Sequence, residues 1–549
     1  MSVIDPSPVA GPGTAPAPAP APTAASGADP RADTIGALLR RSLARSGPAT
    51  AVRFGERSWT YAELAAAVQR VRARLLDAGL PAGSRVAAFG ANSDAYLILF
   101  LACAEAGMVH VPVNFALKGD ELAYLLEGSG AALVVADDAL LPLVGEVRAA
   151  GRAPAVGQVW PMFPDGGRGG PALLETALAE DGPDAAQQGA AGGAPAAAPA
   201  GDTVVQLLYT SGTTSAPKGA MMTHSALLAE YVSAIIALDL TAEDRPLIAM
   251  PLYHSAAMHV FLLPYLALGA AVRIIAKPDV GEILRLVEEE RIGSLFLAPT
   301  VWVPLSNHPD LAARDLSSLA KAQYGASIMP VTVLQRLRLR YPEIGFYNCF
   351  GQSELGPLCT VLRPEEHEAR PASCGRPVYH VEARVMAADG APAAPGEPGE
   401  IQYRSPQLLA GYWNNPEATA AAFDDGWFRS GDQVTRDAAG YIQVVDRIKD
   451  VINTGGVLVA PREIEDCIYE LDEVAEAAVI GLPDERWIEA VTAVVVLKED
   501  AVLTAEAVRA HVRGRLAGHK VPKRVDFVAE LPRNQSGKLL KRALRAERS

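Results

Sequence analysis

The stretch that decides the fold runs from Val204 to Gly219 and reads VVQLLYTSGTTSAPKG. Its first part is a short apolar run that predicts a strand over Val204–Tyr209. Its second part combines glycines, hydroxyl side chains and Lys218, and a helix is expected to begin near Ser225. Glycines let backbone N–H groups approach an anion, hydroxyls donate hydrogen bonds and lysine adds positive charge, so the loop suits phosphate. It is not a Walker A loop, where the lysine follows a glycine and precedes Ser or Thr.

Around this stretch, short apolar runs alternate with amphipathic segments. Thr60-Tyr-Ala-Glu63 is a capping box that opens a predicted helix, and Arg85–Phe89 is typical of a strand. The same alternation continues through Val109–Val111 and Ala132–Val135. Such repetition predicts an α/β fold with a parallel or mixed sheet flanked by helices. The apolar run Tyr96–Ala104 is too short to cross a bilayer and predicts a buried helix.

Composition narrows the class of protein. Of the 549 residues 50% are hydrophobic, which excludes wholesale disorder, and the net charge is −14. Such an acidic chain lacks the basic field that non-specific binding to nucleic acid or anionic membranes requires, so neither partner is expected. The 5 cysteines show no C-x-x-C spacing, which favours a reducing, cytoplasmic location over a disulfide framework or structural zinc site. Residues 1–34 are expected to be a disordered Ala/Pro-rich leader, and residues 182–201 a flexible insertion.

The ten residues Thr210–Gly219 resemble the core motif of the acyl-adenylate-forming (ANL) superfamily, which includes acyl-CoA synthetases, peptide-synthetase adenylation domains and firefly luciferase. The usual form is TSGTTGxPKG, and this chain departs from it at Ser215. Further motifs follow in the family's order: PLYH (251–254), YGASIMP (324–330), NCFGQSE (348–354), GYWNNP (411–416), WFRSGD (427–432), DRIKD (446–450), GG (455–456) and NQSGK (534–538). The resemblance is closest to fatty acyl-CoA synthetases and ligases.

This resemblance implies a large N-terminal domain of flanked β-sheets over residues 35–445. A small, mobile α+β lid domain over residues 446–549 would follow, with its hinge at residues 446–450 and Lys449 in the hinge position. The implied reaction is activation of a carboxylic acid by ATP and Mg²⁺ to acyl-AMP, with release of pyrophosphate. The acyl group would then pass to the thiol of coenzyme A or of a phosphopantetheinyl carrier protein.

The resemblance also assigns roles to individual residues. Lys538 would bridge the substrate carboxylate and the α-phosphate, assisted by the other implied catalytic residues Glu354, Lys218 and His254. Glu354 and Thr213 would hold Mg²⁺, since this ion prefers carboxylate and hydroxyl oxygen. Asp432 would accept both ribose hydroxyls, beside Arg447. The implied ATP-binding set is Thr210, Ser211, Gly212, Thr213, Thr214, Lys218, Gly325, Ala326, Ser327, Asn348, Phe350, Gly351, Ser353, Asp432, Arg447 and Lys538. The implied acyl pocket is His254, Ser255, Ala298, Thr300, Gly325 and Gly351, and the thiol-acceptor loop is Gly455 and Gly456.

The sequence leaves several alternatives open. Peptide-synthetase domains carry an Asp just after the PLYH position to hold an amino group, whereas residues 254–263 contain no acid, so an apolar, fatty carboxylic acid is favoured. Coenzyme A is the favoured acceptor, and a carrier protein is the alternative, because Val457-Leu458 departs from the residues that usually follow the two glycines. A non-catalytic nucleotide-binding relative is disfavoured, since the motif lysines and acids are all present. His259 is interpreted as structural.

The C-terminal end of the chain is basic. Twelve Lys and Arg residues between Arg509 and Arg548 outnumber Asp526, Glu530 and Glu547. Two interpretations are available: contact with anionic ligands, or the solvated face of a terminal helix. The second is favoured for most of these residues.

Overall fold

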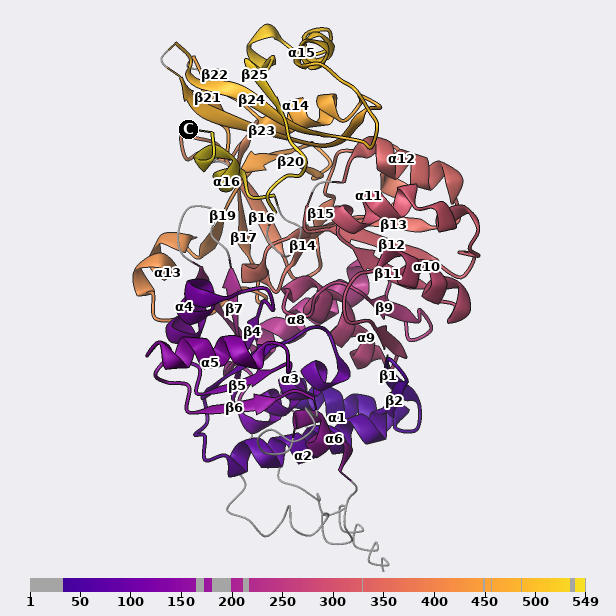
Figure 1. The fold of residues 1–549 in the computed structure, drawn as a ribbon, viewed down its shortest axis with the longest axis vertical. Coiled ribbons are helices and arrows are strands. Elements are labelled where there is room, and N and C mark those ends of the chain that lie inside the picture. Colours follow the sequence, from indigo (N-terminus) through magenta and orange to yellow (C-terminus); the bar gives the residue numbers. More distant parts are fainter. Residues whose placement is uncertain are drawn as a thin grey trace, which may run out of the picture.

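The computed structural model of the 549-residue chain describes residues 33–163, 172–179, 199–210, 217–327, 329–447, 450–455, 457–484, 486–533 and 539–548. The predicted leader to residue 32 and most of the predicted insertion, residues 180–198, lie outside these ranges. In Figure 1 the chain up to β20 forms a broad body, and the C-terminal segment from β21 to α16 forms a domain at one end of it.

A six-stranded sheet carries the phosphate-loop strand. Its order is β6 (Gln158–Pro161), β5 (Leu133–Ala136), β3 (Arg85–Phe89), β4 (Val109–Val113), β7 (Val204–Thr210) and β8 (Lys218–Thr223). All neighbours are parallel except β7 and β8, which are antiparallel. The α/β prediction and the predicted strands of this sheet are therefore confirmed.

Both faces of this sheet are covered, as the side chains of β3 show. Val86 and Ala88 belong to the main hydrophobic core. Ala87 and Phe89 instead point into a smaller core that they share with residues of the helices α4 (Gly119–Ser129) and α5 (Leu141–Ala149). Because successive side chains of a strand point to opposite faces, a strand covered on both sides is apolar throughout. Burial of a side chain as large as Val86 or Phe89 stabilises the fold by about 1.5–3 kcal/mol.

A nine-stranded sheet forms the second layer of the body. Its order is β15 (Arg376–Pro377), β14 (Leu358–Leu362), β13 (Gly345–Gly351), β12 (Lys321–Gly325), β11 (Ser294–Leu297), β9 (Pro246–Ile248), β10 (Val272–Ile274), β1 (Thr50–Phe54) and β2 (Arg57–Thr60). Two groups of predicted site residues lie at the carboxyl ends of neighbouring strands. Gly325 of the predicted ATP-binding set ends β12, and the predicted metal ligand Glu354 follows β13. Ligands of α/β sheets bind at this end of the strands, where loops leave the sheet.

Two smaller sheets follow. The first consists of β16 (Glu382–Met386), β17 (Gly399–Arg404), β19 (Trp427–Arg436) and β18 (Phe423–Asp424), with β20 (Ile442–Arg447) paired to β19. The second, in the C-terminal domain, consists of β22 (Val457–Val459), β21 (Ile452–Thr454), β24 (Ile488–Leu497) and β23 (Val474–Asp484), with β25 (Arg524–Phe527) paired to β24. The C-terminal sheet has hydrophobic clusters of its own, so this domain builds a separate core.

The helices pack on these sheets (Figure 1). The α-helices are α1 (Ile35–Ser46), α2 (Tyr61–Asp77), α3 (Asp94–Ala106), α4 (Gly119–Ser129), α5 (Leu141–Ala149), α6 (Leu173–Leu178), α8 (His224–Ala237), α9 (Leu263–Leu268), α10 (Val280–Glu289), α11 (Pro299–Asn307), α12 (Val331–Arg340), α13 (Pro416–Ala422), α14 (Pro461–Ile468), α15 (Ala505–Arg513) and α16 (Lys541–Ala546). A π-helix spans Ala256–Leu262, and short 3₁₀ helices span Pro309–Ala312, Ser353–Leu355, Pro364–Glu366 and Gly518–Lys520.

Two of the predicted helices are confirmed in detail. The Thr60 hydroxyl accepts a hydrogen bond from Glu63 N and the Glu63 carboxylate accepts one from Thr60 N, which completes the capping box of α2. The apolar run that begins at Tyr96 lies in α3, where Ser93 caps the N-terminus and the run is buried throughout. Among the described helices, none combines the length and apolar character that a bilayer crossing needs.

A buried polar chain joins the six-stranded sheet to the helices behind it. Gln206 of β7 places its Nε2 at 3.1 Å from His110 Nδ1 and its Oε1 at 2.8 Å from His259 Nε2, and His259 Nδ1 lies 2.9 Å from the Tyr231 hydroxyl. With the Gln206 amide nitrogen donating to His110 Nδ1, the amide oxygen accepts from His259 Nε2. His259 Nδ1 in turn accepts from the Tyr231 hydroxyl. Burial lowers the pKa of both His110 and His259 to about 3, so both rings are neutral. The structural interpretation of His259 agrees with these contacts.

These two histidines make stability depend on pH. In the unfolded chain a histidine binds a proton below about pH 6.5, whereas the folded rings bind one only near their lowered pKa values. Stability is therefore lost as the pH falls between these values. His110→Gln is expected to reduce proton uptake on urea unfolding at pH 5 by about one proton, measured with an indicator dye. The exposed His519→Gln serves as the control, and equal uptake by wild type and His110→Gln would contradict the assignment.

Candidate active site

The phosphate loop is the turn of a β-hairpin. The sequence predicts strand, loop and then helix, but the structure inserts the strand β8 before α8 begins at His224. Thr210 and Lys218 are paired across β7 and β8, so the two ends of the predicted phosphate loop lie side by side. The strand was missed because Lys218–Thr223 is short and polar at both ends, and its pairing with β7 defines it. Ser211, Gly212, Thr213 and Thr214 lie outside the described residues.

The GYWNNP motif lies along the other edge of β8. Met221 N donates to Gly411 O at 2.9 Å, Ala410 N to Met221 O at 2.8 Å, and Trp413 N to Gly219 O at 2.8 Å. This pairing places Tyr412 beside the phosphate hairpin, where Lys218 Nζ lies 5.2 Å from the centre of its ring. The contact is within the range of a cation–π interaction.

The Glu354 carboxylate is the point at which these segments meet. Its Oε1 accepts hydrogen bonds from the hydroxyl of Thr210 at 3.0 Å and from the hydroxyl of Tyr412 at 3.2 Å. Glu354 is 9% exposed. Burial, and secondarily the nearby Glu354 charge, raise the pKa of Tyr412, so its hydroxyl remains a donor.

The same carboxylate fits a magnesium ligand. Among the described residues no donor reaches its second oxygen, Oε2, within hydrogen-bond distance. Mg²⁺ is commonly held by one or two carboxylates together with substrate phosphates and water, and hydrogen bonds from neighbouring groups orient such carboxylates. One oxygen of Glu354 is held by two hydroxyls and the other is left for an ion.

Neighbouring hydroxyl and imidazole groups complete this side of the site. Ser353 Oγ lies 3.0 Å from Ser255 Oγ, which joins the predicted phosphate contact to the predicted acyl pocket. Burial lowers the pKa of His254 to about 4, and its Nε2 has no hydrogen-bond partner among the described residues. A neutral His254 therefore presents an unused nitrogen.

Asn92 holds the segment that carries His254, and no sequence pattern predicted this role. Its Nδ2 donates to Met250 O at 3.0 Å and to Ile275 O at 3.1 Å, and its Oδ1 accepts from Leu252 N at 2.7 Å. Asn92 is 3% exposed. One buried amide thus satisfies the backbone at the carboxyl ends of two strands.

Gly325 and Gly351, which belong to both the predicted ATP-binding set and the predicted acyl pocket, are glycines for lack of space. A Cβ on Gly325 would lie 2.1 Å from Cys349 O, and one on Gly351 would lie 1.8 Å from Pro357 O. Ala326, the residue after Gly325, has a φ of 64°, which turns the chain away from the end of β12.

The other predicted residues of this region are also placed. Asn348 Nδ2 donates to Ser373 O at 3.0 Å, and Phe350 packs against the main core. Ala298 is buried at the start of α11, and Thr300, in its first turn, is half-buried, as is Ser327.

The predicted ribose residues lie on neighbouring strands. Asp432 of β19 is paired with Arg447 of β20, and Asp432 is 4% exposed. The backbone N–H of Asp432 donates to Ser430 Oγ at 3.0 Å. The chain thus brings the two motifs together by strand pairing.

Several predicted residues cannot be placed. Lys538, Lys449 and Gly456 lie outside the described residues. Gly455 is described; it has a φ of 66° and its N–H donates to Trp487 O at 2.6 Å. The roles of these residues, and the domain boundary and hinge, stay predictions.

The basic C-terminal segment is largely paired within its own domain. Of the eleven of these cations that the structure describes, nine form ion pairs: Arg509, Arg513, Arg515, Lys520, Arg524, Arg533, Lys541, Arg545 and Arg548. Seven of the partner acids lie before Arg509 in the chain: Asp446, Asp450, Glu463, Glu465, Glu470, Glu476 and Glu506. The sequence count missed them because folding brings them to the segment. The pairing favours a solvated, internally neutralised surface over an anion-binding one.

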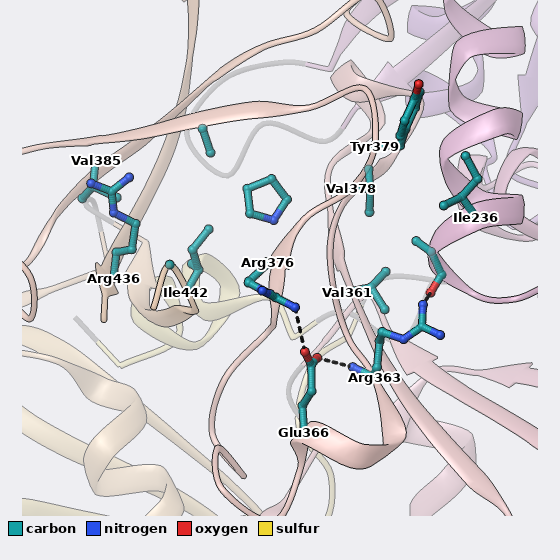
Figure 2. Close-up of a pocket in the computed structure, with 14 residues that line it drawn as sticks. Ile236, Val361, Arg363, Glu366, Arg376, Val378, Tyr379, Val385, Arg436 and Ile442 are labelled. Atoms are coloured by element: carbon teal, nitrogen blue, oxygen red, sulfur yellow. Dashed lines mark hydrogen bonds and ion pairs between the residues drawn. The ribbon is translucent and has the colours of Figure 1, made fainter. Parts of the chain in front are cut away.

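A cavity of about 510 Å³ lies elsewhere in the body (Figure 2). Its apolar floor includes Val361, Val378 and Ile442, and Arg376 at its edge is 3.2 Å from Glu366. None of the predicted site residues that the structure describes lines it. We therefore place the candidate active site at Glu354 and not in this cavity.

The comparison with known proteins identifies the family of the chain. Residues 39–413 match the sequence model of the family described as AMP-binding enzyme, and residues 463–538 match the AMP-binding enzyme C-terminal domain. The chain is an AMP-binding enzyme. Its predicted membership of the acyl-adenylate-forming superfamily is confirmed.

Individual relatives cover nearly the whole AMP-binding enzyme. Feruloyl-CoA synthase from Amycolatopsis sp is 39% identical over 504 residues, 91% of this chain and 96% of the relative. Long-chain-fatty-acid–CoA ligase FadD13 from Mycobacterium tuberculosis is 33% identical over 504 residues, 91% and 94% of the two chains. The solved structure of ATP-bound MatB from Rhodopseudomonas palustris is 31% identical, with a TM-score of 0.83 and coverage of 94% and 99%. This likeness confirms the fold class.

The Tyr412 hydroxyl gives the site a testable dependence. Tyr412→Phe removes one of the two hydroxyls on Glu354 Oε1 and keeps the ring over Lys218. We expect the Mg²⁺ concentration for half-maximal pyrophosphate release to rise about tenfold, which is typical when a residue that hydrogen-bonds a metal ligand is lost. Tyr441→Phe is the matched control, because its hydroxyl bonds Glu366 at the separate cavity. An unchanged Mg²⁺ requirement in Tyr412→Phe would contradict this assignment.

Proposed function

We propose that this AMP-binding enzyme activates an apolar, fatty carboxylic acid with ATP to acyl-AMP, releases pyrophosphate, and transfers the acyl group to the thiol of coenzyme A. The observation that carries the proposal is the convergence of Thr210, Tyr412 and Ser353 on or beside Glu354 at the mouth of the phosphate hairpin. Acyl-CoA ligation is also the activity named for the sequence relatives, which include feruloyl-CoA synthase and FadD13.

In the first half-reaction a carboxylate oxygen attacks the α-phosphorus of ATP and the bond to the β-phosphate breaks. Both reactants are anionic, so the site has to bring negative charges together and stabilise the charge that develops. Glu354 and Thr213 would hold Mg²⁺, which when bound neutralises phosphate oxygens. Lys218 and the hydroxyls of residues 210–214 would cradle the phosphates, with Asp432 and Arg447 at the ribose. Lys538 would lie between the carboxylate and the α-phosphate.

The nature of the acid follows from the segment beside the site. Residues 254–263 carry no acidic side chain that could hold an amino group, and His254 is neutral. An apolar acid therefore fits better than an amino acid. Among the relatives, two are named for fatty acids, FadD8 and FadD13 of M. tuberculosis, while others are named for feruloyl and indoleacetate groups.

Coenzyme A is supported as the acceptor over a carrier protein. The sequence relatives above are named as CoA synthases or ligases, and none of those names supports loading of a carrier protein. The phosphopantetheine thiol would approach past Gly455 and Gly456. The half-reaction forms a thioester and releases AMP.

A panel of acids tests the proposal. We expect pyrophosphate release with ATP and Mg²⁺ to be fastest with medium- and long-chain fatty acids, and mass spectrometry to detect the acyl-CoA after coenzyme A is added. Ferulic and indoleacetic acids are the aromatic comparators, and an amino acid of similar size is the control. Faster release with an aromatic acid would replace the fatty substrate, and absence of release with every acid would overturn the function.

Lys538→Ala separates the two half-reactions. Loss of the charge between the carboxylate and the α-phosphate should reduce acyl-AMP formation at least 100-fold (about 2.7 kcal/mol). Transfer of a supplied acyl-AMP to coenzyme A should stay within a few-fold of wild type, because that step does not use this charge. The matched control is Arg542→Ala in the same basic segment. Equal losses in both half-reactions would contradict the role of Lys538.

A further inference from the structure

Glu230 is a carboxyl group inside the molecule, on α8 next to the loop that carries Glu354. It is 0% exposed. Its Oε1 accepts a hydrogen bond from Leu358 N at 3.2 Å, and its Oε2 accepts one from Gln407 Nε2. A Cβ on Gly356, which has a φ of 93°, would lie 3.0 Å from Glu230 Cβ, so α8 presses directly against residues 354–358.

Gln407 extends this contact to the second segment of the site. Its amide nitrogen also lies 3.1 Å from Leu355 O and 3.2 Å from Leu358 O, and its oxygen accepts from Ser233 Oγ at 2.7 Å. Two residues later, Leu409 N donates to Glu354 O at 2.8 Å. The segment that begins at Gln407 then reaches Tyr412, whose hydroxyl bonds the Glu354 carboxylate.

A carboxyl at this position is unfavourable unless it does something that an apolar side chain cannot. Burial raises the pKa of Glu230 well above its usual range, and its described hydrogen-bond partners are a backbone N–H and an amide. An apolar residue of similar size would avoid this desolvation cost. What the carboxyl adds is direction, because two acceptor oxygens fasten two different segments at once.

We propose that Glu230 is a positioning residue for the metal ligand Glu354. Through Leu358 it holds the loop that follows Glu354, and through Gln407 it holds the segment that ends in Tyr412. The inference rests on the proposed function in assigning Mg²⁺ to Glu354. It adds a layer beneath the hydroxyls of Thr210 and Tyr412, because Glu230 orients the backbone to which the metal carboxylate belongs.

Binding of Mg²⁺ and ATP tests the proposal without any acid substrate. Calorimetric titration of Mg²⁺ into enzyme with ATP would be compared for wild type, Glu230→Gln, Glu230→Leu and Tyr61→Phe. Tyr61 is the control because its buried hydroxyl bonds Leu266 O and Ala270 O, away from this loop. In Glu230→Leu the Mg²⁺ concentration for half-saturation should rise about tenfold or more, with ATP affinity in the absence of Mg²⁺ unchanged. Glu230→Gln, which keeps an acceptor for Leu358 N, should give a smaller rise.

The outcomes separate positioning from general stability. If Glu230→Leu and Tyr61→Phe lower the melting temperature alike and neither changes the Mg²⁺ requirement, Glu230 only stabilises the fold and the inference is overturned. If Glu230→Leu does not fold, Glu230→Gln decides, and a wild-type Mg²⁺ requirement overturns the inference. Failure of the proposed function is a different result. In that case wild type would bind Mg²⁺ and ATP, but none of the acids tested would lead to release of pyrophosphate.

Discussion

The site depends on one buried carboxylate, Glu354, which must be held in a fixed position while most of its surface is removed from water. Isolated burial of such a group is costly, so the fold surrounds it with donors. Two hydroxyls, from Thr210 and Tyr412, bond the same oxygen and leave the other free of described donors. Each hydroxyl comes from a different segment of the chain. The position of the Glu354 carboxylate therefore depends on how these segments pack against each other.

That packing is built in layers. The hairpin β7–β8 supplies Thr210, and the edge of β8 supplies the pairing that carries Tyr412. Beneath them, Glu230 bonds the backbone of Leu358 and Gln407 that of Leu355, in the loop that follows Glu354. Because each layer is buried and hydrogen-bonded, a local displacement would leave unsatisfied polar groups in several places, and the native arrangement is favoured over its alternatives.

Much of the local structure could be predicted from the sequence, because the determining contacts are close along the chain. The capping box at Thr60 and the buried helix that begins near Tyr96 follow from residues three or four positions apart. The strand β8 could not be predicted in this way, since short strands are defined by their partners. The neutralisation of the basic end was missed for the same reason, as Glu463 and Glu470 come from far earlier in the chain.

By itself the sequence determined the α/β architecture, the ordered motifs of an AMP-binding enzyme and the residue types available for phosphate and metal. Only the tertiary structure decided which groups act together: that Tyr412 rather than another tyrosine bonds Glu354, that Ser255 meets Ser353, and that Glu230 supports the loop. The physical reason is that hydrogen bonds act over about 3 Å. Residues 58 to 128 positions apart, as in these pairs, become partners only when the sheets have packed and strand pairing has set their register.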